Sequence, residues 1–180
     1  AYGDGRGAPS GYGQDGRNRK PSRPYTGLDG RAYKSKGEAQ VADWLLLNGV
    51  PYRYEEPYPV DTRNSEYRTQ YRPDFHIPST DVYIEYWGVN RNGRVDPRWG
   101  SRHGLDPSIE YREGMEWKRR LHRDNGTELV ELYSWQRQDG TLERSLRRQL
   151  RRRGVKRAPW VQRMRIRRAV KSNTRWGASQ

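Results

Sequence analysis

Two short alternating segments on either side of a turn restrict the fold of this chain most strongly. Residues 71–77 and 82–88 alternate between apolar and polar side chains, and the Pro-Ser-Thr-Asp sequence between them is typical of a turn. A turn centred on residues 79 and 80 pairs the segments as antiparallel strands, in a register that places Asp74 directly opposite Glu85. The alternation assigns one apolar face to Tyr71, Phe75, Ile77, Val82, Ile84 and Tyr86.

Asp74 and Glu85 belong to the other face of this strand pair. Side chains directly opposite each other on antiparallel strands have Cβ atoms about 5 Å apart, a distance at which like charges destabilise the sheet. A divalent cation between them would remove the repulsion, because Mg²⁺ is bound by one or two carboxylates together with carbonyl oxygens and waters. The alternative is that a base such as Arg72 neutralises the pair and no metal binds.

Turn and capping patterns predict the elements around these strands. They indicate a helix from residue 36 to 48, a strand at 52–58, a helix from Pro107 to about Asp124, a strand at 128–135, and a helix at 142–153 that carries leucines at every fourth position. The predicted order is α-β-β-β-α-β-α. This order is that of an α/β domain with a mixed central sheet flanked by helices.

Glu38 adds a third carboxylate near the start of the first helix. It stands three residues after Ser35, the spacing of a capping box, so one interpretation is that it only stabilises the helix start. The other interpretation is that a helix packed over the sheet directs this carboxylate at the metal. The spacing alone supports both.

Composition divides the chain into a domain and two tails. Apolar residues make up only 31% of the 180 residues, which excludes a large core, and the absence of cysteine excludes disulfides, zinc ribbons and thiol nucleophiles. We expect a folded domain over residues 34–154. Residues 1–33, which contain eight glycines, predict a Gly/Arg-rich arm that is disordered or ordered by a partner, and residues 155–180 a flexible basic tail.

The positive charge is concentrated near the C-terminal end. Residues 137–175 carry a net +13 of the total +14, which indicates a polyanionic partner, nucleic acid before any other. No apolar run is long enough to cross a membrane, so we expect no membrane partner and an intracellular location in cytoplasm or nucleoid, with an organelle left open. The predicted nucleic-acid-binding residues are Arg72, Arg147, Arg148, Arg151, Arg152, Arg153, Lys156, Arg157, Arg163, Arg165, Arg167 and Arg168.

An ordered set of motifs gives the chain a family resemblance. The set consists of Glu38 on a helix, Tyr-Arg-Pro-Asp-Phe at 71–75, Ile-Glu-Tyr-Trp-Gly at 84–88, and Trp-Lys-Arg at 117–119. It resembles the PD-(D/E)xK nuclease superfamily, and most closely the nuclease-like domain of helicase-IV-type DNA helicases. The resemblance covers roughly residues 33–158 and leaves both tails outside. It implies a restriction-endonuclease-like core and magnesium- or manganese-dependent hydrolysis of nucleic acid.

The resemblance also implies roles for individual residues. Asp74 and Glu85 would hold the metal, the Tyr86 carbonyl would complete part of its coordination, and Glu38 would bind or orient a water. The superfamily lysine is expected two residues after the glutamate, where this chain has Trp87. Lys118 is the predicted substitute, with Lys36 and Arg72 as alternatives.

Two functions follow as hypotheses. The first is a metal-dependent nuclease domain that cuts DNA in preference to RNA, either alone or beside a helicase. The second is a non-catalytic nucleic-acid-binding module on a degenerate nuclease fold, for example as part of a larger nucleoprotein assembly such as a ribosome. The acidic residues favour the first, whereas Trp87 and the basic tail favour the second.

Overall fold

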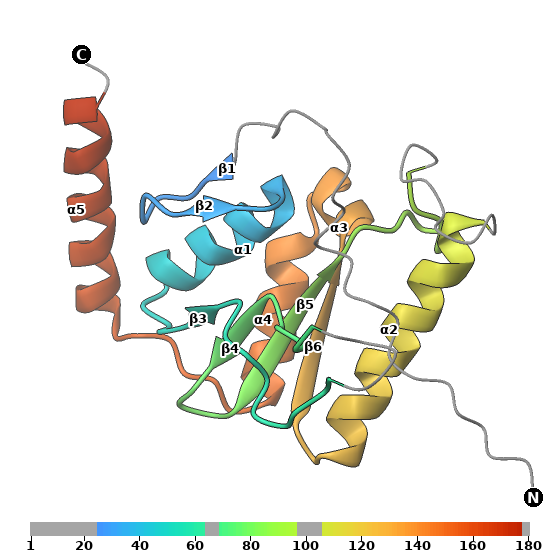
Figure 1. Cartoon of the computed structure of the whole chain (residues 1–180). Helices are drawn as coiled ribbons and strands as arrows, with labels where there is room; N and C mark the ends of the chain where they lie inside the picture. Colours follow the sequence, from blue (N-terminus) through green and yellow to red (C-terminus); the bar gives the residue numbers. More distant parts are fainter. Residues whose placement is uncertain (1–24, 64–68, 97–105, 178–180) are drawn as a thin grey trace, which may run out of the picture.

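A four-stranded mixed sheet forms the centre of the molecule (Figure 1). The computed structural model describes residues 25–63, 69–96 and 106–177. The strands are β3 (Arg53–Tyr54), β4 (Phe75–Ile77), β5 (Val82–Trp87) and β6 (Glu128–Tyr133), and they lie in that order across the sheet. β3, β4 and β5 are antiparallel neighbours, whereas β6 runs parallel to β5. The predicted mixed α/β architecture is confirmed.

The register of the hairpin is the predicted one. Phe75 pairs with Ile84 and Ile77 with Val82, and Asp74, which directly precedes β4, lies near enough to Glu85 for the charge of Glu85 to act on it. The strands are nevertheless shorter than the pattern predicted, because β3 and β4 have only two and three residues. Prolines at positions 57, 59 and 73 have no backbone N–H to donate to a neighbouring strand, which limits pairing there.

Helices cover both faces of the sheet. On one face, α1 (Lys36–Leu47) and α4 (Leu142–Arg152) bury the main core, in which the three predicted leucines of α4 are at most 2% exposed. On the other face lies α2 (Pro107–Asp124), which packs through two smaller clusters around Trp87 and Tyr83. α2 begins at its predicted N-cap, since the Asp106 carboxylate accepts a hydrogen bond from the Ser108 N–H at 2.8 Å.

Tyr71 corrects the predicted apolar face. Its ring packs with Tyr58 and Tyr83 on the α2 side of the sheet rather than with Phe75 on the α1 side. The reason is that residues 71–74 precede β4, so the strict alternation of a strand does not extend back through Pro73. The predicted strand at 128–135 is also shorter, because the short helix α3 (Ser134–Gln138) begins directly after Tyr133.

The structure corrects the expectation of flexible tails at two places. Residues before the domain form a hairpin of β1 (Tyr25–Thr26) and β2 (Ala32–Tyr33). The buried Tyr33 stabilises this hairpin, because its hydroxyl donates a hydrogen bond to Asp29 at 2.8 Å. After α4, residues Trp160–Gly177 form the helix α5, which packs against α1. The rest of the predicted arm, residues 1–24, and the last three residues lie outside the described part of the chain.

Gly49 determines how closely α5 can approach α1. Its φ is +63°, and a Cβ there would lie 2.4 Å from the Cβ of Ala158, whereas Gly126 has a φ of +64° and nothing within 4 Å of such a Cβ. Both alanine variants should lose about 1 kcal/mol to backbone strain. Gly49→Ala should lose about 1–3 kcal/mol more through overpacking against Ala158. Urea unfolding of the two variants tests this, and equal losses would show that the Ala158 contact does not constrain Gly49.

Candidate active site

Four predicted site residues come together from four parts of the fold. Glu38 belongs to the first turn of α1, Asp74 directly precedes β4, Glu85 lies in β5, and Lys118 lies in α2. The Lys118 ammonium is 2.8 Å from Glu85 Oε2, and Asp74 Oδ2 accepts a hydrogen bond from the Tyr86 N–H at 2.7 Å. The charges of Glu38, Glu85 and Lys118 all act on the Asp74 carboxyl. Asp74, Glu85 and Lys118 therefore form one site, and the charge of Glu38 reaches it from α1.

Glu85 is the buried centre of the site. Its side chain is 2% exposed, and each carboxylate oxygen has a partner: the Tyr71 hydroxyl donates to Oε1 at 2.6 Å and Lys118 to Oε2 at 2.8 Å. A carboxylate has about four lone-pair positions, so both oxygens keep the capacity for a further ligand. The base that neutralises Glu85 is thus Lys118. Arg72 instead donates to the Glu55 carbonyl at 2.9 Å.

Asp74 is an acid in an unfavourable environment. Removal from water raises its pKa well above the usual value, and the negative charges of Glu85 and Glu38 raise it further. Lys118 and the Tyr86 N–H act in the opposite direction with smaller effect. Within the described residues, no group donates to Asp74 Oδ1. A bound cation at this oxygen would reverse the balance and favour the charged form.

Glu38 has the predicted capping role, and its charge also acts on the Asp74 carboxyl. Its N–H donates to Ser35 Oγ at 3.1 Å, and the Ser35 hydroxyl donates back to Glu38 Oε1 at 2.7 Å. The Tyr54 hydroxyl donates to Oε2 at 2.5 Å, and burial raises the pKa of the carboxyl despite these bonds. Gly37 permits this position, since a Cβ there would be 1.9 Å from the Tyr86 ring. The water-orienting role of Glu38 stays a prediction.

Trp87 occupies the position of the expected lysine and supports its substitute. The indole is 2% exposed and donates a hydrogen bond to Glu131 at 2.9 Å, so its position on the α2 side of the sheet is fixed. The Lys118 ammonium lies 5.0 Å from the centre of the Trp87 ring and 5.2 Å from that of Tyr71. Cation–π attraction to both rings therefore helps to hold the ammonium on Glu85.

A chain of hydrogen bonds that the sequence patterns do not predict leads away from Glu85. Tyr71, which binds Glu85, lies 3.1 Å from His122 Nε2, and His122 Nδ1 lies 2.8 Å from Thr127 Oγ1. Burial and the charge of Lys118 lower the pKa of His122 to about 4, so the ring is neutral at pH 7. The spacing along α2 could have indicated this contact, because His122 follows Lys118 by four residues and therefore lies on the same face of the helix.

Most of the predicted nucleic-acid-binding cations form two groups. Arg147, Arg151, Lys156, Arg157 and Arg163 line one groove, whereas the exposed Arg148, Arg152, Arg165, Arg167 and Arg168 do not. Arg153 is tied to the fold instead, through Glu128 at 3.0 Å and the Leu129 carbonyl at 3.1 Å.

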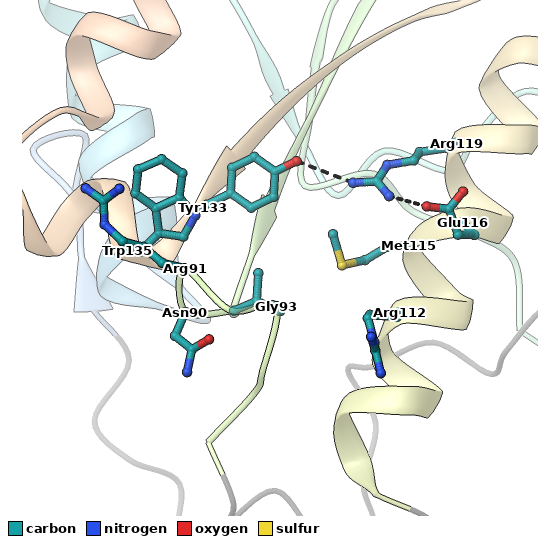
Figure 2. A pocket seen from close by; sticks show the side chains of 10 residues that line it. Asn90, Arg91, Gly93, Arg112, Met115, Glu116, Arg119, Tyr133 and Trp135 are labelled. Carbon is teal, nitrogen blue, oxygen red and sulfur yellow. Dashed lines mark hydrogen bonds and ion pairs between the residues drawn. The ribbon is translucent and has the colours of Figure 1, made fainter.

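A cavity of about 300 Å³ lies where β5 and β6 end (Figure 2). Its arginines are already engaged: Arg119 binds Glu131 at 2.6 Å and also Glu116, and Arg91 pairs with Asp139 at 2.5 Å. Arg112 donates to the Ser108 carbonyl at 3.2 Å. The cavity therefore offers little free positive charge.

Comparisons with protein-family models, with curated proteins and with solved structures find no match for this chain. In the described part of the chain, no three His, Asp or Glu side chains form a group that could hold a metal ion, and no helix is long and apolar enough to cross a membrane. A cation at this site would have Asp74 and Glu85 as its protein carboxylates. Such a pair fits Mg²⁺, which keeps several waters and uses one or two protein carboxylates.

The pKa of Asp74 makes a prediction for the metal-free protein. Folding raises the pKa of Asp74, so the protonated carboxyl stabilises the fold at low pH. This stabilisation is lost as the pH rises through the folded-state pKa. Asp74→Asn keeps an acceptor for the Tyr86 N–H and removes the charge. In EDTA at pH 8 we expect the variant to melt several degrees above the wild type, with the difference shrinking toward pH 4. A variant that melts lower at pH 8 would contradict the raised pKa.

Proposed function

We propose that this chain is a metal-dependent nuclease domain that hydrolyses phosphodiester bonds of nucleic acid, with DNA as the substrate that the family resemblance favours. The supporting observation is the meeting of Asp74 and Glu85 with Lys118 at one point of the sheet. The order of α1, the antiparallel β3, β4 and β5, the crossover helix α2 and the parallel β6 supports a restriction-endonuclease-like core.

Each residue has a task that its surroundings support. Asp74 and Glu85, with the Tyr86 carbonyl, would hold the cation, which supplies charge neutralisation at the phosphate and acidifies a water. Lys118 would stabilise the negative charge that develops on the phosphate oxygens, as a fixed cation held by Trp87 and Tyr71. Glu38 would accept a proton from the attacking water, for which a raised pKa is favourable.

The second candidate is a non-catalytic nucleic-acid-binding module. Its support is that Lys118 already neutralises Glu85 and that Trp87 replaces the lysine of the motif. In that case Lys118 is a structural counter-ion and not a catalytic group.

Cleavage assays separate the two. Labelled single- and double-stranded DNA and RNA are incubated with the full chain in Mg²⁺, Mn²⁺ or EDTA. The nuclease proposal expects shortened products with either metal and none in EDTA. Intact substrates in all metal conditions, with binding retained, would favour the non-catalytic module.

A further inference from the structure

A basic groove of about 550 Å³ lies between α1, α4 and α5. In Figure 1 these are the cyan helix, the orange helix and the red helix at the left. Trp44, Val50 and Leu150 contribute apolar contacts to it, and its cations are Arg147, Arg151, Lys156, Arg157 and Arg163. No acidic residue lines it, so the groove carries five positive charges without compensation.

The positive charges in the groove repel one another. Across the described residues, none of the five cations forms an ion pair, and Arg157 donates only to the amide oxygen of Asn48 at 3.3 Å. Burial lowers the pKa of Arg157, and the charges of Arg163 and Arg147 lower it further. Arg163 Nε is buried and has no hydrogen-bond partner among the described residues. An unsatisfied buried donor of this kind is costly, and an anion in the groove would satisfy it.

The start of α5 adds to this preference for an anion. The helix begins at Trp160, and both Pro159 and Trp160 line the groove. The first N–H groups of a helix lack partners within it and carry partial positive charge, which favours phosphate. This contribution acts at the same place as the Arg163 guanidinium, one helical turn further on.

Trp160 indicates which kind of anion fits. Its side chain is 67% exposed at the edge of the groove, where an exposed indole is available to stack on a base. A membrane surface fits less well, because a helix that lies on lipid needs a wide apolar face. α5 instead has exposed arginines at 165, 167 and 168, on several sides of the helix.

We infer that this groove binds a single strand of nucleic acid, with phosphates on its five cations and one base stacked on Trp160. The groove lies on the α1 and α4 side of the sheet, whereas Lys118 belongs to α2. Binding here needs neither the metal nor the acidic residues of the candidate active site. The inference therefore holds whether or not the domain cuts its substrate.

Two double variants of α4 test the groove with the same loss of charge. Arg147→Ala with Arg151→Ala removes two groove cations, and Arg148→Ala with Arg152→Ala removes two exposed cations outside it. Binding of fluorescein-labelled dT20 to the full chain is measured by anisotropy in EDTA. The groove pair should weaken binding about 10-fold or more and flatten the salt dependence by about 1–2 units, while the control pair changes affinity less than about threefold.

Trp160→Ala tests the stacked base. It should weaken the binding of dT20 about 5- to 100-fold and leave the binding of a 20-base-pair duplex with hairpin-closed ends nearly unchanged, because both faces of a base inside a duplex are already covered by its neighbours. If the two α4 double variants weaken dT20 binding equally, the groove is not the binding site, because the loss then reflects a diffuse electrostatic effect. Unchanged dT20 binding in Trp160→Ala would overturn the stacking. Loss of binding to phosphatidylserine vesicles in the groove pair with dT20 binding retained would assign the groove to lipid and overturn the inference.

Discussion

Glu85→Gln should abolish metal-dependent cleavage, with a loss in rate of about 10³-fold or more, and should leave nucleic-acid binding nearly unchanged. Glu85 is the most enclosed carboxylate of the site, and it links the proposed cation-binding pair to Lys118 and Tyr71. Glutamine has the same size and can still accept from Tyr71, but it carries no charge to hold a cation. Single-turnover cleavage with Mg²⁺ measures the effect, and anisotropy in EDTA measures binding.

Glu131→Gln is the matched control for this variant. Glu131 is the partner of Glu85 on the neighbouring strand β6, and its carboxylate binds Trp87 and Arg119 rather than Lys118. We expect this variant to cleave within a few-fold of the wild type once it is shown to be folded. Wild-type cleavage by Glu85→Gln would remove the proposed site altogether.

Lys118→Met should lower turnover by about 10²-fold or more, because it removes the cation that the structure fixes on Glu85. The apparent Mg²⁺ affinity should not fall and should rise, since both carboxylates remain and Glu85 loses a competing positive charge. Arg120→Met is the control, as Arg120 lies two residues further along α2 and is exposed. Cleavage at the wild-type rate by Lys118→Met would move the role to Lys36 or Arg72.

Stability helps to interpret the Lys118 variant. Removing one partner of a buried ion pair leaves the other charge uncompensated and costs about 3–5 kcal/mol. Lys118→Met should therefore melt lower than the wild type in EDTA, and Mg²⁺ should recover part of the difference by neutralising Glu85. Melting unchanged by Mg²⁺ would contradict a cation site beside Glu85.

The hairpin and its acidic pair were predictable because a few local rules determine them. A four-residue turn and a period of two set the pairing of Phe75 with Ile84, and this pairing brings Asp74 beside Glu85. The start of α2 at Asp106 and the buried leucines of α4 follow from capping and helical spacing in the same way. Each of these signals acts over a few residues.

The remaining features depend on packing between distant segments. Tyr71 packs on the α2 side because the chain before β4 is irregular, and its contact with His122 joins residues 51 positions apart. The close approach of α1 to β5 depends on Gly37 lying against the Tyr86 ring. The docking of α5 depends on Gly49 and on the Ala158 N–H, which donates to the Asn48 carbonyl at 3.0 Å. No periodicity in the sequence reports such contacts.

Binding of Mn²⁺ to the full chain tests the central claim, a cation site made by Asp74 and Glu85, most directly. Electron paramagnetic resonance counts the bound ion in the wild type and in Asp74→Asn. We predict one Mn²⁺ per chain in the wild type, weaker binding as the pH falls because a proton competes for Asp74, and loss of this site in the variant. Equal Mn²⁺ binding by the two proteins, or no binding by the wild type at millimolar Mn²⁺, would contradict it.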